Sequence, residues 1–236
     1  GDKFDIMPKT GLYWNEPTRG PQNVTPQTFF DGTENQNRVS GGKLTSYFSI
    51  RDDNCGRYMD ELDATAKSLI WEVNRIHSQG AGTKLFDYAQ GQQGVQNSTV
   101  PLGSAQTVLP DAGKIQAGNV NFYFYDKTTG DYVSSGQLDF DSATAGVQNF
   151  DPAVHSLDDV VGAINNTFPT QLSASVQDGR LVITTAAGSN LQFALGTDST
   201  GMMAALGINT FFTGTDANSI AVNSQLHSNV NYIAAG

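Results

Sequence analysis

The sequence predicts an α+β fold: a domain containing one long helix, with a β-rich outer domain of ββαβββ-like order inserted into it. Three observations lead to this prediction. Between Cys55 and Gly80 the apolar residues recur at alternating spacings of four and three, which is typical of a helix. From Asn119 the apolar period falls to two, as in β-strands. Asp178-Gly179 separates two such runs, which is a strong signal for a hairpin.

The predicted helix carries an apolar stripe, here called the 3-4 stripe, composed of Cys55, Met59, Leu62, Ala66, Leu69, Val73 and Ile76. Because an α-helix turns once in 3.6 residues, these side chains share one face, as in helices that pack nearly parallel to a neighbour. Asp52 and Asp53 suit the positive end of a helix, and Gly80 suits its end. We expect one uninterrupted helix whose 3-4 stripe is covered by the rest of its own domain.

The segments on either side of this helix show no regular period. Residues 1–50 contain prolines at positions 8, 17, 21 and 26, so they are predicted to be extended and rich in turns. Residues 81–118 are poor in charge, and their apolar residues are scattered. A connection of this length without regular structure is uncommon inside a compact domain, so it is interpreted as a surface crossing between two domains.

The remaining elements follow from apolar alternation and turn residues. Ser156 and Asp159 match a capping box, which predicts a helix that Pro169 ends. Strands are expected at 120–125, 132–140, 172–176, 181–185 and 191–195, and a short helix at 202–206. The predicted domains are therefore residues 1–112 together with 207–236, forming the helix-containing core domain, and residues 113–206, forming the β-rich inserted outer domain.

Composition excludes several classes of function. The 236 residues include 13 basic and 23 acidic side chains, and this net charge of -10 argues against partners such as nucleic acid or an anionic membrane. No apolar run reaches the roughly 20 residues that span a bilayer, and no signal-peptide pattern opens the sequence. With one cysteine, Cys55, the chain has no internal disulfide.

Residues able to carry out chemistry are few and dispersed. His77, His155 and His227 lie in separate segments without a second ligand at metal-binding spacing, and no phosphate-binding or nucleophile motif occurs. We therefore predict no catalytic residue, no metal site and no cofactor. His77 is expected to be partly buried or bonded to the last helical carbonyls. An enzyme would require a pocket that gathers His155 or His227 with acids, and aromatic residues within 120–125 leave open a sugar-binding platform.

Three stretches of the chain resemble flagellar hook-associated protein 1 of bacteria, the family at the junction of hook and filament. The most specific runs from Gly41-Gly42-Lys43-Leu44 to Val73-Asn74-Arg75-Ile76-His77-Ser78-Gln79-Gly80. The second comprises Leu206-Gly207-Ile208, Phe211-Phe212-Thr213-Gly214 and Ile220-Ala221-Val222-Asn223. The third, residues 115–206, is similar to a module inserted in flagellins and hook-associated proteins. Long terminal heptad helices, which that family has, do not occur in this sequence.

The resemblance implies a structural adaptor at the hook-filament junction, of which this chain is the surface-exposed middle portion, without catalysis. It implies flagellar hook protein and the other hook-associated proteins as partners, and self-association in a ring through the missing termini. It also implies an extracellular location in the flagellum, with export that cleaves no signal peptide. The exposed helix residues Arg57, Glu61, Glu72 and Arg75 are the predicted subunit contacts. The alternative is a secreted module that binds a glycan or a cell surface.

Overall fold

The computed structural model describes residues 3–7, 11–15, 43, 46–47 and 50–234. The chain divides into two compact units, Gly1–Ala64 and Thr65–Gly236. In the first unit β1 (Lys3–Met7) pairs antiparallel with β2 (Gly11–Asn15), so that Phe4 is opposite Trp14. The four prolines and most of the segment predicted to be rich in turns lie outside the described residues.

The long helix is continuous, as predicted. A π-helical segment, η1 (Ile50–Cys55), leads directly into α3 (Gly56–His77). The α-helix therefore begins one residue after Cys55 and ends three residues before Gly80. Ser78 still donates its backbone N–H to the carbonyl of Asn74, which completes the last turn.

The face of α3 that is buried differs from the predicted one. Members of the 3-4 stripe are largely in solvent: the exposed fractions are 67% for Met59, 60% for Leu62, 47% for Leu69 and 66% for Ile76. The buried residues of α3 are Ala66, Ile70, Trp71, Asn74 and His77. The prediction that the 3-4 stripe is covered by its own domain is therefore wrong, and only Ala66 belongs to both sets.

The reason is a rotation of the packed face by about one residue. Ile70, Asn74 and His77 follow one position after Leu69, Val73 and Ile76, so both sets have helical spacing. Hydropathy favours Leu69, Val73 and Ile76, because Asn74 and His77 in the other set are polar. Asn74 and His77 are nonetheless 6% exposed each, because their side chains bond to backbone groups of a distant segment.

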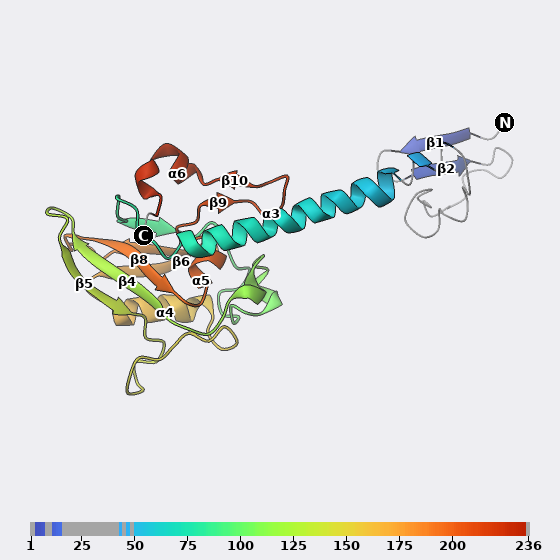
Figure 1. Ribbon diagram of the computed structural model, residues 1–236. Helices are drawn as coiled ribbons and strands as arrows, with labels where there is room; N and C mark the ends of the chain where they lie inside the picture. The colour runs from blue at the N-terminus through green and yellow to red at the C-terminus, as the bar shows by residue number, and fades with distance from the viewer. Residues whose placement is uncertain (1–2, 8–10, 16–42, 44–45, 48–49, 235–236) are drawn as a thin grey trace. The chain divides into compact units, whose positions relative to one another are not determined.

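The second unit contains two three-stranded antiparallel sheets (Figure 1). One sheet has the order β5-β4-β8, with β4 (Val120–Asp126) between β5 (Tyr132–Gln137) and β8 (Leu191–Asp198). The other has the order β3-β7-β6, formed by β3 (Tyr88–Gln90), β7 (Arg180–Thr185) and β6 (Leu172–Gln177). Helices together with antiparallel sheets confirm the predicted α+β class.

Helices and short segments complete this unit. Helix α4 (Leu157–Thr167) lies between β5 and β6 in sequence and contacts β6. After β8 come α5 (Met202–Ala205), β9 (Phe212–Thr213), β10 (Ala221–Val222) and α6 (Ser224–Ser228). Three 3-10 turns are η2 (Ala105–Thr107), η3 (Ala112–Lys114) and η4 (Val230–Tyr232).

Two local signals in the sequence have the geometry that they predict. At the start of α4 the Ser156 backbone N–H donates to Asp159 Oδ2 over 2.8 Å, and the Asp159 N–H donates to Ser156 Oγ, which completes the capping box. Between β6 and β7, Asp178 and Gly179 have φ values of 51° and 73°. A two-residue hairpin turn of this type needs positive φ at both positions, which explains the Asp-Gly pair.

Aromatic side chains fill the core of the second unit. Phe122 and Phe124 of β4 are 0% and 1% exposed, whereas Tyr123 between them is 36% exposed, as strand alternation predicts. Their rings meet the ring of Phe168, just after α4, at centroid distances of 5.6 and 5.1 Å. Phe193 of β8 lies 6.2 Å from Phe122, so α4 and two strands share one cluster.

The segment between α3 and β4 belongs to this core. Phe86 forms a β-bridge with Phe193, strand β3 pairs with β7, and Leu102 is fully buried. Residues 81–118 were predicted to be a surface crossing between domains, but they supply a strand and core side chains. Seven of their apolar residues belong to the buried core cluster: Phe86, Ala89, Val95, Leu102, Leu109, Ala112 and Ile115. The compact units divide between Ala64 and Thr65.

The corrected face of α3 can be tested with two adjacent residues. Leu69→Glu is expected to change the free energy of unfolding by less than about 0.5 kcal/mol, because Leu69 is half in solvent. Ile70→Glu should lower it by about 3 kcal/mol or more, because a carboxylate would be buried without a partner. Urea denaturation followed by circular dichroism measures both. An equal loss at the two positions would contradict the assignment.

Candidate functional site

The C-terminal end of α3 holds the segment that follows α5 through buried polar side chains. Asn74 Oδ1 accepts hydrogen bonds from the backbone N–H groups of Phe211 and Phe212, at 2.9 and 2.8 Å. Asn74 Nδ2 donates to the Phe212 carbonyl over 3.0 Å. One side chain thus satisfies three backbone groups that a short, irregular segment leaves without partners. Asn74 therefore anchors the segment that leads into β9.

Two further side chains extend this anchor. Asn209, whose φ is 50°, donates from Nδ2 to the carbonyls of His77 and Gly80 at 3.2 and 3.0 Å. Asn223 Nδ2 donates to the Thr210 carbonyl over 2.9 Å, while its Oδ1 caps α6. Asn74 and Asn223, which belong to the stretches quoted for the resemblance, thus hold backbone groups of this segment. His77 was expected to be partly buried or bonded to the last helical carbonyls; it is 6% exposed, and its Nδ1 contacts the carbonyl of Asn209, outside the helix.

The four predicted subunit-contact residues form two ion pairs on α3. Arg57 Nε lies 3.7 Å from Glu61 Oε1, and both side chains are more than half exposed. Arg75 donates from Nε and Nη2 to Glu72 Oε2, at 3.2 and 3.0 Å. At 100° per residue these four side chains lie along one side of the 3-4 stripe, opposite the buried face. They form a charged border to the exposed apolar residues.

The part of the 3-4 stripe that lies in the second unit, with the charged residues beside it, makes up the candidate functional surface. Within the second unit it consists of Leu69, half-buried Val73 and Ile76, with Glu72 beside them. The same helix carries Met59 and Leu62 further toward its N-terminus. An apolar row at alternating spacings of three and four is the pattern by which one helix packs along another. Exposed apolar rows bordered by polar residues mark interaction surfaces.

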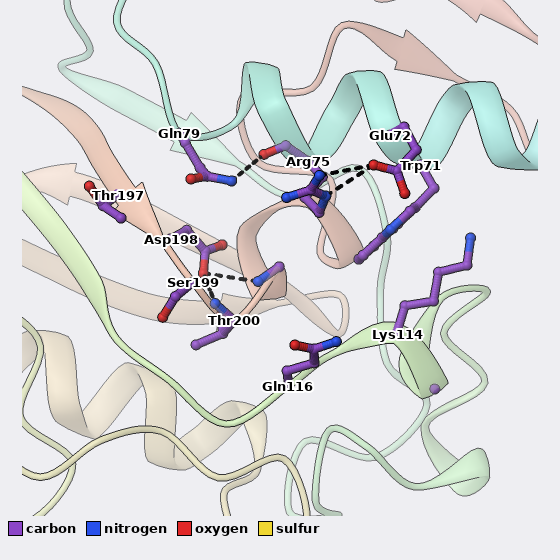
Figure 2. Close-up of a pocket in the computed structure, with 12 residues that line it drawn as sticks. Trp71, Glu72, Arg75, Gln79, Lys114, Gln116, Thr197, Asp198, Ser199 and Thr200 are labelled. Atoms are coloured by element: carbon purple, nitrogen blue, oxygen red, sulfur yellow. Dashed lines mark hydrogen bonds and ion pairs between the residues drawn. The ribbon is translucent and has the colours of Figure 1, made fainter.

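Beside the charged border is a pocket with a volume of about 650 Å³, lined by three segments of the chain (Figure 2). Helix α3 contributes Trp71, Glu72, Arg75 and Gln79; the η3 turn and the residues after it contribute Gly113, Lys114 and Gln116; the end of β8 contributes residues 197–201. Apart from the indole of Trp71, the labelled side chains are polar or charged. The pocket is therefore suited to water or a polar ligand.

The charged groups in this pocket already have partners. Lys114 Nζ lies 2.9 Å from Asp111 Oδ1 and 4.9 Å from the centre of the Trp71 ring. Arg75 is paired with Glu72. A charged ligand would have to compete with these contacts. The pocket was not foreseen from the sequence, because its lining comes from three distant segments.

Asp198 is the most deeply buried acid of the pocket lining, at 2% exposed. Its carboxylate accepts hydrogen bonds from the Thr200 hydroxyl and from the backbone N–H groups of Thr200, Gly201 and Met203. Burial raises the pKa of Asp198 above its ordinary value, and these hydrogen bonds oppose the rise. With four donors turned toward it, the carboxylate binds the turn that starts α5. Its position indicates a structural role.

The other two histidines are not brought together with acids in this pocket. His155 Nδ1 accepts a hydrogen bond from the Asp151 N–H over 2.8 Å, and its ring lies 4.9 Å from that of Phe140. His227 is exposed in the last turn of α6. Among the residues that the structure describes, no group of three or more His, Cys, Asp or Glu side chains is arranged to hold a metal ion.

Two acids, Asp126 and Asp141, lie at the start of surface turns. Asp126 Oδ1 accepts from the backbone N–H groups of Thr128 and Thr129, and these bonds lower the pKa of Asp126. Asp141 accepts from the Thr144 hydroxyl and from the Ala143 N–H, with the same effect on its pKa. Each carboxylate is used to close its own turn.

Comparison with known proteins does not identify a relative: no family model matches the chain, and no curated protein matches its sequence. Within the described part of the chain, none of the helices combines the length and apolar character needed to cross a bilayer.

The anchor formed by Asn74 has a measurable energetic consequence. Asn74→Ala is expected to lower the free energy of unfolding by about 2–4 kcal/mol, because the buried backbone groups of Phe211 and Phe212 lose their partners. Arg75→Ala, the neighbouring exposed residue, should cost less than about 1 kcal/mol. Urea denaturation of both variants tests this. A loss below about 1 kcal/mol for Asn74→Ala would show that water replaces the side chain without penalty.

Proposed function

We propose that this chain is the surface-exposed middle portion of a structural adaptor of the bacterial flagellum, located at the junction of hook and filament. In this proposal the chain has no catalytic role. Its partners are flagellar hook protein and the other hook-associated proteins, and the full-length subunit associates in a ring through its termini. The subunit is extracellular and is exported without cleavage of a signal peptide.

The observation that carries the proposal is the exposed 3-4 stripe on a continuous helix. Leu62, Leu69 and Ile76 are each exposed by 47% or more, although burying a side chain of this size contributes about 1.5–3 kcal/mol. A row of such residues suits a partner helix that crosses α3 at about 20°. In an assembly this apolar surface would be buried against a partner, whereas in a monomeric enzyme or carrier it would stay exposed to solvent.

The charged border suits the same function. Each of the two ion pairs, Arg57 with Glu61 and Arg75 with Glu72, is largely in solvent, so it contributes little to the stability of the chain itself. At the edge of an interface such pairs select a partner and fix its register. The strands and helix within residues 113–206 would then form the outward, β-rich part of the subunit, in the order ββαβββ.

A variant of the stripe tests the proposal in the full-length protein. Leu69→Glu combined with Ile76→Glu should leave the subunit folded, since both positions are exposed, but should abolish its incorporation at the junction. Motility and electron microscopy of filaments measure the result. Val147→Glu is the matched control, because Val147 is 54% exposed and lies outside α3.

The two outcomes are distinct. Motile cells with normal filaments in the double variant would contradict a role of the 3-4 stripe in assembly. Charge reversal at the border, Arg57→Glu with Arg75→Glu, should weaken assembly without abolishing it, because such pairs tune selection rather than supply most of the binding energy.

A second candidate function, a secreted module that binds a glycan or a cell surface, is favoured by one observation. Tyr123 and Tyr125 lie two residues apart on β4, and Tyr125 is opposite Tyr132 of β5, so the three share one face of the sheet. The rings of Tyr125 and Tyr132 are 6.0 Å apart, and Tyr132 is 58% exposed. Open aromatic faces of this kind stack on sugar rings.

A glycan array probed with the 236-residue chain separates the two candidates. The adaptor proposal predicts no binding above background. Binding that is lost in Tyr132→Ala, but retained in the control Tyr88→Ala, would favour the glycan-binding module instead, because Tyr88 is also exposed but lies on the other sheet.

A further inference from the structure

We propose that His77 is a pH-dependent latch that holds the backbone of Ile233 and Ala234 against the end of α3 and releases it when the imidazole is protonated. The imidazole lies between two backbone groups. Its Nδ1 is 2.8 Å from the carbonyl oxygen of Asn209, and its Nε2 is 3.0 Å from the backbone nitrogen of Ala234. The inference is independent of the proposed flagellar function.

These two partners select one form of the ring. A carbonyl oxygen accepts only, so Nδ1 must carry a hydrogen; an amide N–H donates only, so Nε2 must be free of one. The arrangement is therefore that of the neutral imidazole with its hydrogen on Nδ1. Protonation of Nε2 would place two N–H groups against each other and break the bond to Ala234.

The carbonyl of Asn209 favours the charged ring, but burial of the imidazole opposes it more strongly. His77 is 6% exposed, and the ring of Phe211 lies 5.5 Å from it, edge to face. The groups in contact with the imidazole come from Asn209, Phe211 and Ala234, none of which has a titratable side chain. On α3 itself the nearby guanidinium of Arg75 is paired with Glu72. Burial lowers the pKa of His77 below 6.5.

The direction of the pH effect follows from this lowered pKa. When Ile233 and Ala234 are released, His77 meets water and its pKa returns toward 6.5, so the released state binds a proton more readily than the latched state. The latch is fully effective above about pH 6.5. It weakens as the pH falls through that value toward the lower pKa of the latched state.

The contacts of the preceding residues allow a local release. Tyr232 stacks on Phe86 at 5.4 Å, and the Lys84 N–H donates to the Asn231 carbonyl over 2.9 Å. These contacts hold residues 231 and 232, and neither depends on the charge of His77. Loss of the Ala234 bond therefore frees Ile233 and Ala234 from α3, while Asn231 and Tyr232 stay in place.

The experiment follows single sites by NMR in the isotope-labelled 236-residue chain, between about pH 7.5 and about pH 5. The measured quantity is the exchange rate of the Ala234 amide divided by its rate in an unstructured chain at the same pH. We expect this ratio to rise on the order of tenfold toward the acid end. The rise should share its midpoint with the titration of the His77 ring protons.

Matched variants assign the effect. In His77→Gln the ratio should no longer depend on pH, whereas His227→Gln, a control at an exposed histidine, should behave as the unmodified chain. A constant ratio in the unmodified chain, or an unchanged rise in His77→Gln, would overturn the proposal. If His77→Gln does not fold, the test is made in the unmodified chain by comparing the midpoint of the Ala234 exchange ratio with the midpoint of the His77 ring titration. Midpoints that differ would overturn the proposal.

Discussion

The constraint on which this structure depends is that backbone groups removed from water must find partners. The segment after α5 is irregular, with only the two-residue strands β9 and β10, so its own ladders satisfy few of its groups. Asn74 and His77 supply the missing partners from the end of α3. To reach that segment both must be buried, and this requirement turns α3 so that Ile70 and Trp71 enter the core. The same rotation leaves most of the 3-4 stripe exposed to solvent.

Local signals in the sequence predicted what local geometry determines. The hairpin at Asp178-Gly179, the capping box at Ser156 and the alternation in β4 depend on residues close in the chain, and all are present in the structure. The packed face of α3 depends instead on carbonyl and N–H groups more than a hundred residues away, which no periodicity reports. Periodicity ranks positions by apolarity, so it chose the exposed set and missed Asn74 and His77. The pocket beside Trp71 escaped prediction for the same reason, because its three lining segments meet only in the folded unit.

Most of the polar side chains described at the end of α3 and in the pocket hold turns and segments of the second unit together. Arg75 and Lys114 in the pocket are each paired with an acid. Asp198 accepts hydrogen bonds from the turn that starts α5, and Asp126 accepts hydrogen bonds within its own surface turn. Most apolar residues of the 3-4 stripe lie exposed on one side of α3, with paired charges along the margin of the stripe.

The pairing of β3 with β7 has a consequence for how the chain acquires its shape. Tyr88 is opposite Thr184, so the first strand of this sheet stays without its neighbour until the chain has been made as far as β7. Contacts between positions so distant in the chain close slowly, because a large loop must be ordered before they form. Helix α3, by contrast, needs only its own turns to begin. Helix α3 can therefore form before β3 joins its sheet.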